Sequence, residues 1–267
     1  ALELLCAKNR SDAVMLAEDL KALNDSRKEM TEKGVEQAVE QIESTSMQED
    51  PVLVVYLPDC HESIAGIIAG RLRERYYRPV FVLTRAEDGV KGSGRSTESY
   101  NMFEEMCKCR ALFTKFGGHK LAAGLSLPET NVPRFRQGIN QMADLSEEAL
   151  MEKVSIDMQM PLQYVTEELV EELELLEPFG KGNTKPVFVE KDMLVLNSRI
   201  LGKNQNVLKM QVKDLGGTVM DAIYFGEAQE CLEKIRSAGG KITATYYPSI
   251  NEFRGQKTLQ IVIQNYR

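Results

Sequence analysis

The sequence is poor in the residue types that build metal centres. It has only two histidines, His61 and His119, and five cysteines. Its many aspartates and glutamates show no ligand spacing such as H-E-x-x-H or an EF-hand loop. Metal-dependent hydrolases need clustered carboxylate and imidazole groups around one or two divalent ions. We therefore predict that the histidines, cysteines and carboxylates of this sequence hold no metal ion.

The scarcity of cysteine and of long apolar runs limits the class of protein. Five scattered cysteines, an odd number, predict reduced thiols and a cytoplasmic protein. No apolar run approaches the ~20 residues of a membrane span, so we expect no membrane partner. The adjacent Cys60 and His61 are a poor nucleophile and base, because neighbours at a helix start rarely reach the required geometry. The helical pattern is already present at Ala1, as in the interior of a helix, so we expect the chain to be a segment of a longer protein.

The net charge of −7 argues against non-specific nucleic-acid binding by the whole surface. The charge is uneven, however. Acidic residues crowd residues 144–177, whereas arginine and lysine crowd residues 71–95. This basic segment is either a local anion-binding surface or a solvated helix face.

Hydrophobic periodicity predicts an α/β region followed by a β-rich region. The expected elements of the first region are a helix over 1–43, a strand over 52–57, a helix over 61–75 with Asp59 as its N-cap, a strand over 79–83, a strand ending near residue 94, a helix over 101–116, a strand over 125–127 and a helix over 132–145. Strand, helix and strand at this spacing indicate a βαβ unit with parallel pairing. The second region is expected to hold a strand over 154–160, one helix near 169–176, and strands over 187–197, 206–214, 218–225, 241–247 and 258–264. Short strands at this spacing predict a small barrel.

Two glycine-framed clusters carry the clearest chemical signal. They are Gly92-Ser93-Gly94-Arg95-Ser96 and Phe116-Gly117-Gly118-His119-Lys120. Glycine lets the backbone approach a ligand, and guanidinium, imidazole, ammonium and hydroxyl groups bind phosphate. The predicted phosphate-binding residues are Ser93, Gly94, Arg95, Ser96, Gly117, Gly118, His119 and Lys120. The alternatives are an ordinary surface arginine and a surface-loop histidine.

Aromatic and basic residues are mixed in the β-rich region, as on surfaces that bind single-stranded nucleic acid. The candidate contacts are His61, Tyr247, Phe253 and Arg254. About half of the aromatic residues of this region should belong to the core instead. His61 has an equally simple structural interpretation, as a hydrogen-bonded residue at a helix start.

Several motifs in order resemble the RecJ family of single-strand-specific 5′→3′ exonucleases, in the DHH phosphoesterase superfamily. They are His61-Glu62-Ser63-Ile64-Ala65-Gly66-Ile67-Ile68-Ala69, Arg78-Pro79-Val80, Lys91 to Ser96, Phe116 to His119 with Ala122-Ala123-Gly124, Leu176 to Asn183, and Ile250 to Gly255 with Leu259-Gln260. The resemblance implies a bridging helix over 1–48, a DHHA1 domain with a mixed sheet and flanking helices over 49–147, and an OB-fold barrel domain over 148–267. Cys60 stands where the family usually has tryptophan.

The resemblance also implies a function. The family degrades single-stranded DNA in repair and recombination, with Mn²⁺ or Mg²⁺ held by an Asp-His-His motif that this sequence lacks. The chain alone should therefore be inactive, and should hold the 5′ end of the strand through Arg95, Ser96 and His119. The expected partner is single-stranded DNA, with single-strand-binding protein as a further candidate, and the expected state is a monomer. Two alternatives stay open: a DHH–DHHA1 oligoribonuclease or cyclic-dinucleotide phosphodiesterase, and a single-strand-binding module that never cleaves.

Overall fold

The chain forms two compact units, Ala1–Glu152 and Lys153–Arg267, in a computed structural model. The structure describes residues 1–180, 182–253 and 255–267, except for the side chain of Phe253. None of the helices in these residues combines the length and apolar character that crossing a membrane requires.

The first unit is built on a five-stranded mixed sheet in the order β1-β2-β3-β5-β4. Its strands are β1 (Leu53–Tyr56), β2 (Val80–Ala86), β3 (Gly89–Arg95), β4 (Lys115–His119) and β5 (Ala122–Leu127). The parallel pair β1–β2 is joined by helix α3 (Glu62–Tyr76), which confirms the predicted βαβ unit. The other pairs are antiparallel.

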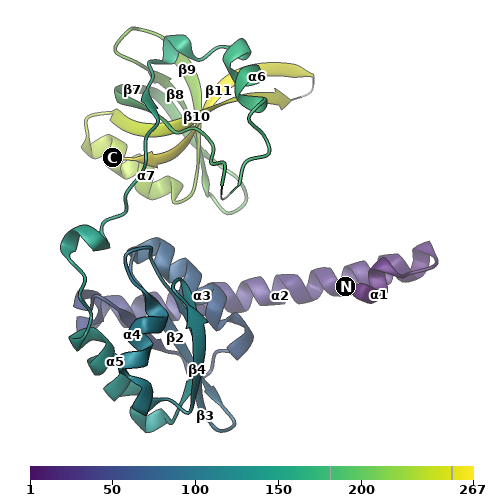
Figure 1. The fold of residues 1–267 in the computed structure, drawn as a ribbon. Helices are drawn as coiled ribbons and strands as arrows, with labels where there is room; N and C mark the ends of the chain where they lie inside the picture. Colours follow the sequence, from purple (N-terminus) through teal and green to yellow (C-terminus); the bar gives the residue numbers. More distant parts are fainter. Residues whose placement is uncertain (181, 254) are drawn as a thin grey trace. The chain divides into compact units, whose positions relative to one another are not determined.

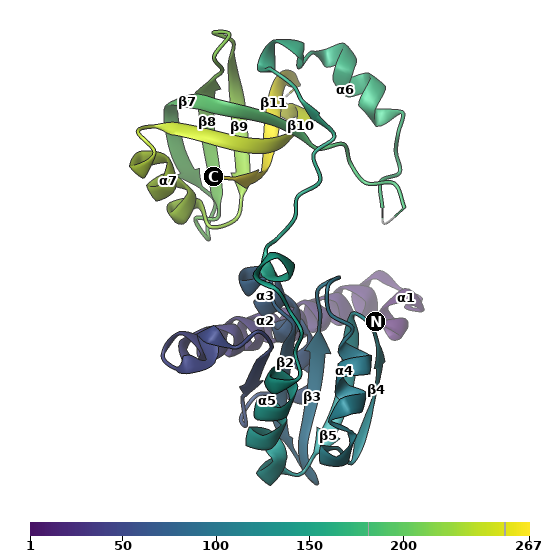
Figure 2. The same ribbon diagram turned by 60° about the vertical axis from the view of Figure 1, so that its left-hand side comes forward.

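The two faces of this sheet are covered differently. Helices α4 (Met102–Lys108) and α5 (Val132–Gln141) enclose one face with an apolar core that includes Phe81, Leu125 and Phe135 (Figure 2). The other face receives α3 and the end of α2 (Arg10–Glu43), which share a separate core over β1 and β2. Beyond α3, the outward positions of β4 and β5 are exposed at Lys115, Gly117, His119 and Gly124.

Helix α2 is the long N-terminal helix that the periodicity predicts, and the short α1 (Leu2–Leu5) precedes it (Figure 1). Its buried residues all lie in its C-terminal half: Thr31, Gly34, Ala38 and Ile42. The remaining shorter helical turns are Ser46–Glu49, Arg110–Leu112, Glu129–Asn131, Glu147–Leu150 and Leu162–Tyr164.

Two sequence-based expectations for this unit are wrong. The N-cap of α3 is His61, not Asp59, because the His61 imidazole accepts the backbone N–H of Ser63. The helix expected over 101–116 ends at Lys108, and the second glycine cluster is strand β4. Adjacent glycines have a low strand propensity, but here pairing with β5 imposes the extended conformation.

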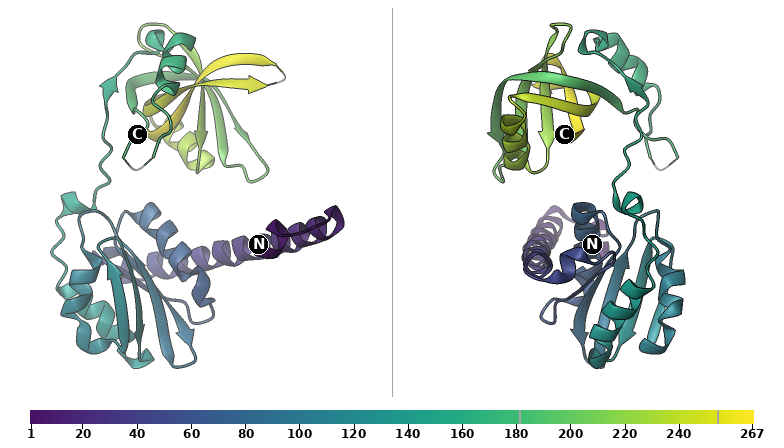
Figure 3. Two further views of the ribbon diagram at one scale, coloured as in Figure 1. Left: turned by 45° about the vertical axis from the view of Figure 1, so that its right-hand side comes forward. Right: turned by 90° about the vertical axis from the view of Figure 1, so that its left-hand side faces the viewer.

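The second unit is a closed five-stranded barrel (Figure 3). Its strands are β7 (Phe188–Leu201), β8 (Val207–Lys213), β9 (Val219–Phe225), β10 (Lys241–Phe253) and β11 (Gln256–Tyr266). They pair in the order β7-β8-β9-β11-β10, and β10 returns to β7. All pairs are antiparallel except β9–β11, which is the topology of an OB-fold.

All five predicted barrel strands are present, and helix α6 (Glu167–Glu174) is the predicted helix. The strand expected over 154–160 is reduced to β6 (Met158–Gln159), whose two residues are exposed. The sequence interpretation missed α7 (Ala228–Ser237) between β9 and β10. Its residues Ala228, Cys231 and Ile235 share one helix face and pack into the barrel core.

We predict that Gly94→Ala destabilises the first unit. An added Cβ would lie 2.4 Å from the Met102 sulfur and 2.8 Å from the Phe81 ring, inside the core. Overpacking of this kind costs roughly 1–3 kcal/mol, measurable by urea unfolding. The control is Gly70→Ala in α3, where an added Cβ meets nothing within 4 Å. That control should leave stability unchanged or raise it by about 0.5–1 kcal/mol. Equal effects of the two changes would contradict the packing role of Gly94.

Candidate nucleic-acid interface

The strand register brings the two glycine clusters onto one face of the first sheet. Arg95 lies opposite Ala122, and Ala122 lies opposite His119 on its other side. Residues that lie opposite each other in antiparallel strands present their side chains on the same face. The predicted phosphate ligands Arg95 and His119 therefore flank Ala122 from β3 and β4.

Two more rows of residues continue this arrangement along the strands. They are Ser93–Gly124–Gly117 and Lys91–Ser126–Lys115. We use the name bare face for the surface made by these three rows: Lys91, Ser93, Arg95, Lys115, Gly117, His119, Ala122, Gly124 and Ser126. It carries basic groups at both ends and small residues between them.

The glycines of the two clusters have different roles. Gly94 is buried and faces the apolar core, so packing explains its lack of a side chain. Gly118 has a φ of +154°, and an added Cβ would lie 2.4 Å from the Ala122 carbonyl oxygen, so the β4–β5 hairpin requires glycine there. By contrast, a Cβ on Gly117 would meet nothing within 4 Å. Gly117 and Gly124 thus leave open backbone on the bare face without serving the core.

Arg95 is held between the sheet and α3. Its Nη1 donates to the Gly94 carbonyl at 2.7 Å, and the side chain is half-buried. An added Cβ on Gly66 of α3 would lie 2.8 Å from Nη2 of Arg95 and 3.3 Å from Oγ of Ser93. Gly66 therefore makes room for the guanidinium at the edge of the bare face.

His119 is exposed, and its Nδ1 accepts the backbone N–H of Leu121 at 3.3 Å. In the neutral ring this contact places the proton on Nε2, which can then donate to a ligand. The neighbouring Lys120 is also exposed and pairs with Glu98 at 3.1 Å. Exposed pairs of this kind are worth little, so the Lys120 ammonium can exchange Glu98 for another anion.

Ser96 and His61 already have partners within the fold. The Ser96 hydroxyl is buried and donates to the Tyr100 carbonyl at 2.8 Å. The His61 ring is exposed; its Nδ1 lies 3.2 Å from the Ser63 nitrogen and 2.7 Å from the Ser63 hydroxyl oxygen. His61 thus has the structural role that was its alternative interpretation, and it also lines a cavity of about 960 Å³.

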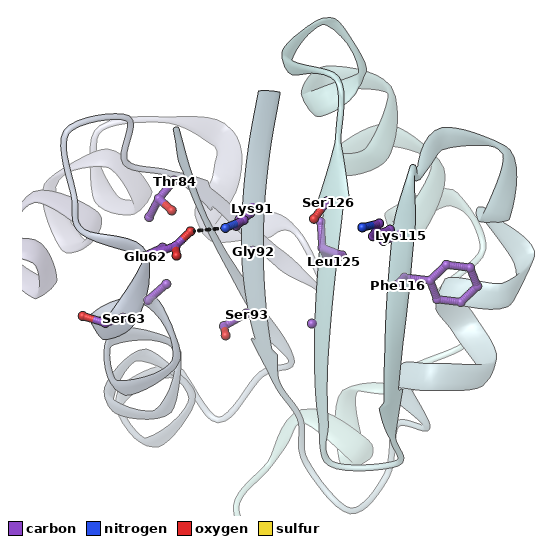
Figure 4. A pocket seen from close by; sticks show the side chains of 12 residues that line it. Glu62, Ser63, Thr84, Lys91, Gly92, Ser93, Lys115, Phe116, Leu125 and Ser126 are labelled. Atoms are coloured by element: carbon purple, nitrogen blue, oxygen red, sulfur yellow. Dashed lines mark ion pairs between the residues drawn. The ribbon is translucent and has the colours of Figure 1, made fainter. Parts of the chain in front are cut away.

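A second cavity of about 420 Å³ lies beside it, over the Lys91 end of the bare face (Figure 4). Both cavities are lined by Glu62, Lys91, Lys115 and Ser126. Glu62 and Lys91 form an ion pair of 2.7 Å. Their mutual hydrogen bond lowers the pKa of Glu62 and raises that of Lys91, so both groups are charged at neutral pH.

In the barrel unit, Tyr247 lies mostly within the core, at 7% exposure. Its ring packs edge-on against Phe179 at 6.1 Å, and the Lys185 ammonium lies 4.4 Å from its centre. Burial raises the pKa of the Tyr247 hydroxyl. The other two barrel candidates, the Phe253 side chain and Arg254, lie outside the described residues.

A better aromatic candidate is Phe225, which is 59% exposed at the end of β9. On the same outer face, Arg199 of β7 lies opposite Lys209 of β8. The alternation Leu208, Met210, Val212 inward and Lys209, Gln211, Lys213 outward is visible in the sequence and could have identified this surface. An exposed ring beside basic groups suits base stacking and phosphate contact.

Within the described ranges, no group of three or more His, Cys, Asp or Glu residues is placed to hold a metal ion. These residues therefore do not fit a divalent-metal centre, and no catalytic step through a metal can be derived from them. What the bare face can do is bind an anion.

Comparison with known proteins finds a matching domain model for each of the two units. The DHHA1 domain model matches residues 49–144, and the RecJ OB domain model matches residues 156–265. The chain carries a DHHA1 domain and a RecJ OB domain. It is 32% identical to the single-stranded-DNA-specific exonuclease RecJ of Bacillus subtilis, over 99% of this chain and 34% of that protein. With the Escherichia coli protein of the same name the identity is 33%, over 98% of this chain and 46% of that protein.

Solved structures of RecJ share the fold. The Thermus thermophilus RecJ structure with Mg²⁺ superimposes with a TM-score of 0.77 at 23% identity, over all of this chain and 40% of that one. The structure with Mn²⁺ gives 0.78 at the same identity, over 38% of that chain. The present chain spans less than half the length of these relatives.

We predict that His61→Ala lowers the free energy of unfolding by about 0.5–2 kcal/mol, because α3 loses its N-cap. His61→Asn should retain most of the stability, since asparagine caps helices well. Urea unfolding measures both. If His61→Asn restores stability but weakens binding of a single-stranded oligonucleotide, the ring has a ligand contact besides its cap. An equal loss of stability in the two variants would contradict the capping role.

Proposed function

We propose that this chain is the substrate-binding part of a RecJ-like 5′→3′ exonuclease that acts on single-stranded DNA in repair and recombination. In this proposal the bare face holds the phosphates at the 5′ end of the strand. The single observation that supports it most is the row Arg95–Ala122–His119, which joins residues from two separate glycine clusters.

The bare face suits a nucleic-acid backbone for physical reasons. Guanidinium forms paired hydrogen bonds with phosphate oxygens, and an imidazole Nε2 adds a further donor. Gly117 and Gly124 allow the strand to lie close to the sheet. Lys120 contributes positive charge at the same end, and Ser93 a hydroxyl. Gly94, Gly118 and Ser96 then act as parts of the framework, and we assign them no contact with the strand.

The barrel is proposed to offer a further binding surface for a single strand. The outer face of β7, β8 and β9 offers Phe225 for stacking and Arg199 and Lys209 for phosphates. Lys209 pairs with Asp221 at 2.9 Å, so a phosphate would have to compete with that carboxylate. This barrel also favours a single-stranded DNA substrate over the short oligoribonucleotides and cyclic dinucleotides of the alternative.

Cleavage would need residues that the described part of this chain does not provide. We propose that Mn²⁺ or Mg²⁺, the ions in complex with RecJ in the Thermus thermophilus structures, binds in the portion of the relatives that this chain does not cover. The metal would activate water for attack on a phosphodiester. A cytoplasmic location, a monomeric state and contact with single-strand-binding protein remain predictions.

We predict that Arg95→Ala weakens binding of a 5′-phosphorylated single-stranded oligonucleotide by roughly 1.5–3 kcal/mol, the range for a charged hydrogen bond. His119→Ala should cost less at an assay pH where imidazole is neutral, because its contribution is then one uncharged hydrogen bond. Fluorescence anisotropy measures the affinity, with duplex DNA as a weak competitor. The melting temperature should hardly move, since surface changes alter stability within about ±0.5 kcal/mol. Unfolding of either variant, with normal binding by the folded remainder, would show a structural role instead.

A second prediction concerns cleavage. The repurified chain should not degrade a labelled single strand in excess Mn²⁺, because the described residues hold no ligand set for the ion. Gel analysis over time measures this. Turnover that persists through repurification and disappears with a chelator would contradict the division of binding and cleavage.

A further inference from the structure

The Lys91–Ser126–Lys115 row belongs to the bare face but has no separate role in the function proposed so far. It repeats the chemistry of the Arg95 row at the far end of that face. Lys91 and Lys115 come from β3 and β4, and both are exposed. In each row two basic residues flank a small residue of β5. The row at the far end is therefore a second place where the sheet can hold an anion.

The separation of the rows fits two different phosphates and not one. Arg95 and Lys91 lie four residues apart on β3, which is about 13 Å at the rise of an antiparallel strand. We therefore assign the two rows to two different phosphates. Between them lie Ser93, Gly124 and Gly117, where the backbone is open. A nucleotide chain bound at Arg95 can thus continue along the bare face toward Lys91.

A cavity marks the far row as more than a pair of surface lysines. The 420 Å³ cavity is lined there by Lys91, Lys115, Ser126, Ser63 and Thr84 (Figure 4). Thr84 is fully buried, and among the described residues its hydroxyl has no hydrogen-bond partner. Because Thr84 has no exposed surface, its hydroxyl is not reached by a ligand in this cavity as the fold stands, and the proposed contacts are those of Lys91, Lys115, Ser126 and Ser63.

The two lysines differ in their present partners. Lys91 is paired with Glu62 at 2.7 Å, whereas the described residues place no carboxylate within ion-pair distance of Lys115. An incoming phosphate at Lys91 must therefore compete with the Glu62 carboxylate, which also repels it. Glu62 is exposed at the start of α3, so its pair with Lys91 is easily exchanged.

We infer that Lys91 and Lys115 form a second phosphate contact of the bare face, which binds a later phosphate of the same strand, and that Glu62 weakens this contact. The inference rests on the function proposed above. It adds a length requirement, because only a strand that spans both rows gains from the second contact. It also predicts the direction of a change in affinity: removing the Glu62 carboxylate should strengthen binding.

The test uses the full chain and 5′-phosphorylated thymidine oligonucleotides of one to four nucleotides, at the lower limit of the ~4–16 nucleotides bound by an OB-fold. Lys115→Gln should weaken binding roughly twofold to fivefold for the longest oligonucleotides and leave the mononucleotide unchanged. Glu62→Gln should strengthen binding of the same long oligonucleotides by a similar factor. The control is Lys28→Gln on α2, which removes one exposed, ion-paired lysine elsewhere on the unit.

Salt dependence gives an independent measure. Lys115→Gln should reduce the slope of log affinity against log salt by about 0.7 for the longest oligonucleotide, the value for one phosphate contact on a single strand. The inference is overturned if Lys115→Gln behaves like Lys28→Gln at every length, if its loss is already complete with the mononucleotide, or if Glu62→Gln weakens binding. Arg95→Ala separates the two proposals. If Arg95→Ala leaves oligonucleotide affinity unchanged, the proposed function of the bare face fails. If Arg95→Ala weakens binding while Lys115→Gln does not, only the second phosphate contact fails.

Discussion

The close approach of α3 to β3 at Gly66 is the contact on which the candidate interface depends. Ile64, Ile68 and Leu72 anchor the helix over β1 and β2, where they share one apolar core. At Gly66 the same helix leaves only enough room for the Arg95 guanidinium and the Ser93 hydroxyl. The helix therefore both ends the covered part of the sheet and holds the arginine at its border.

The exposed half of the sheet follows from this arrangement. The opposite face of β3, β5 and β4 is buried against α4 and α5, so inward positions must be apolar or small, as at Leu125 and Gly94. Outward positions of β5 and β4 lie beyond α3 and are free to be basic, small or hydroxyl-bearing. An acidic chain, with a net charge of −7, can in this way present a local basic surface.

The sequence predicted the fold well where the hydrophobic periodicity of a segment and its length indicate the same type of element. The run over 52–57 and the stripe of α3 predicted the βαβ unit, and the spacing of short strands and turns after residue 187 predicted the five barrel strands. Strand β4 was missed because its glycines carry no periodic signal, and only pairing with β5 makes them a strand. The N-cap of α3 was misassigned because His61 is an unusual cap, whereas Asp59 fits the usual preference.

The candidate site was predicted in its residue types but not in its geometry. The glycine clusters indicated Arg95 and His119, yet their position on either side of Ala122 depends on the β3–β5–β4 order, which no local pattern encodes. For the same reason Lys115 was overlooked, since it is separated from Lys91 by a helix and a turn in the sequence. Ser96 and Tyr247 were selected by type, and their burial is a property of tertiary packing.

The central claim is that a single strand lies along the bare face. Amide chemical shifts of the isotope-labelled chain, titrated with a 5′-phosphorylated tetranucleotide, test it most directly. The account predicts saturable shifts at Ser93, Gly117, Gly124 and Leu121, with α4 and α5 unaffected. Shifts confined to the barrel, or to the α4 and α5 side of the sheet, would contradict it.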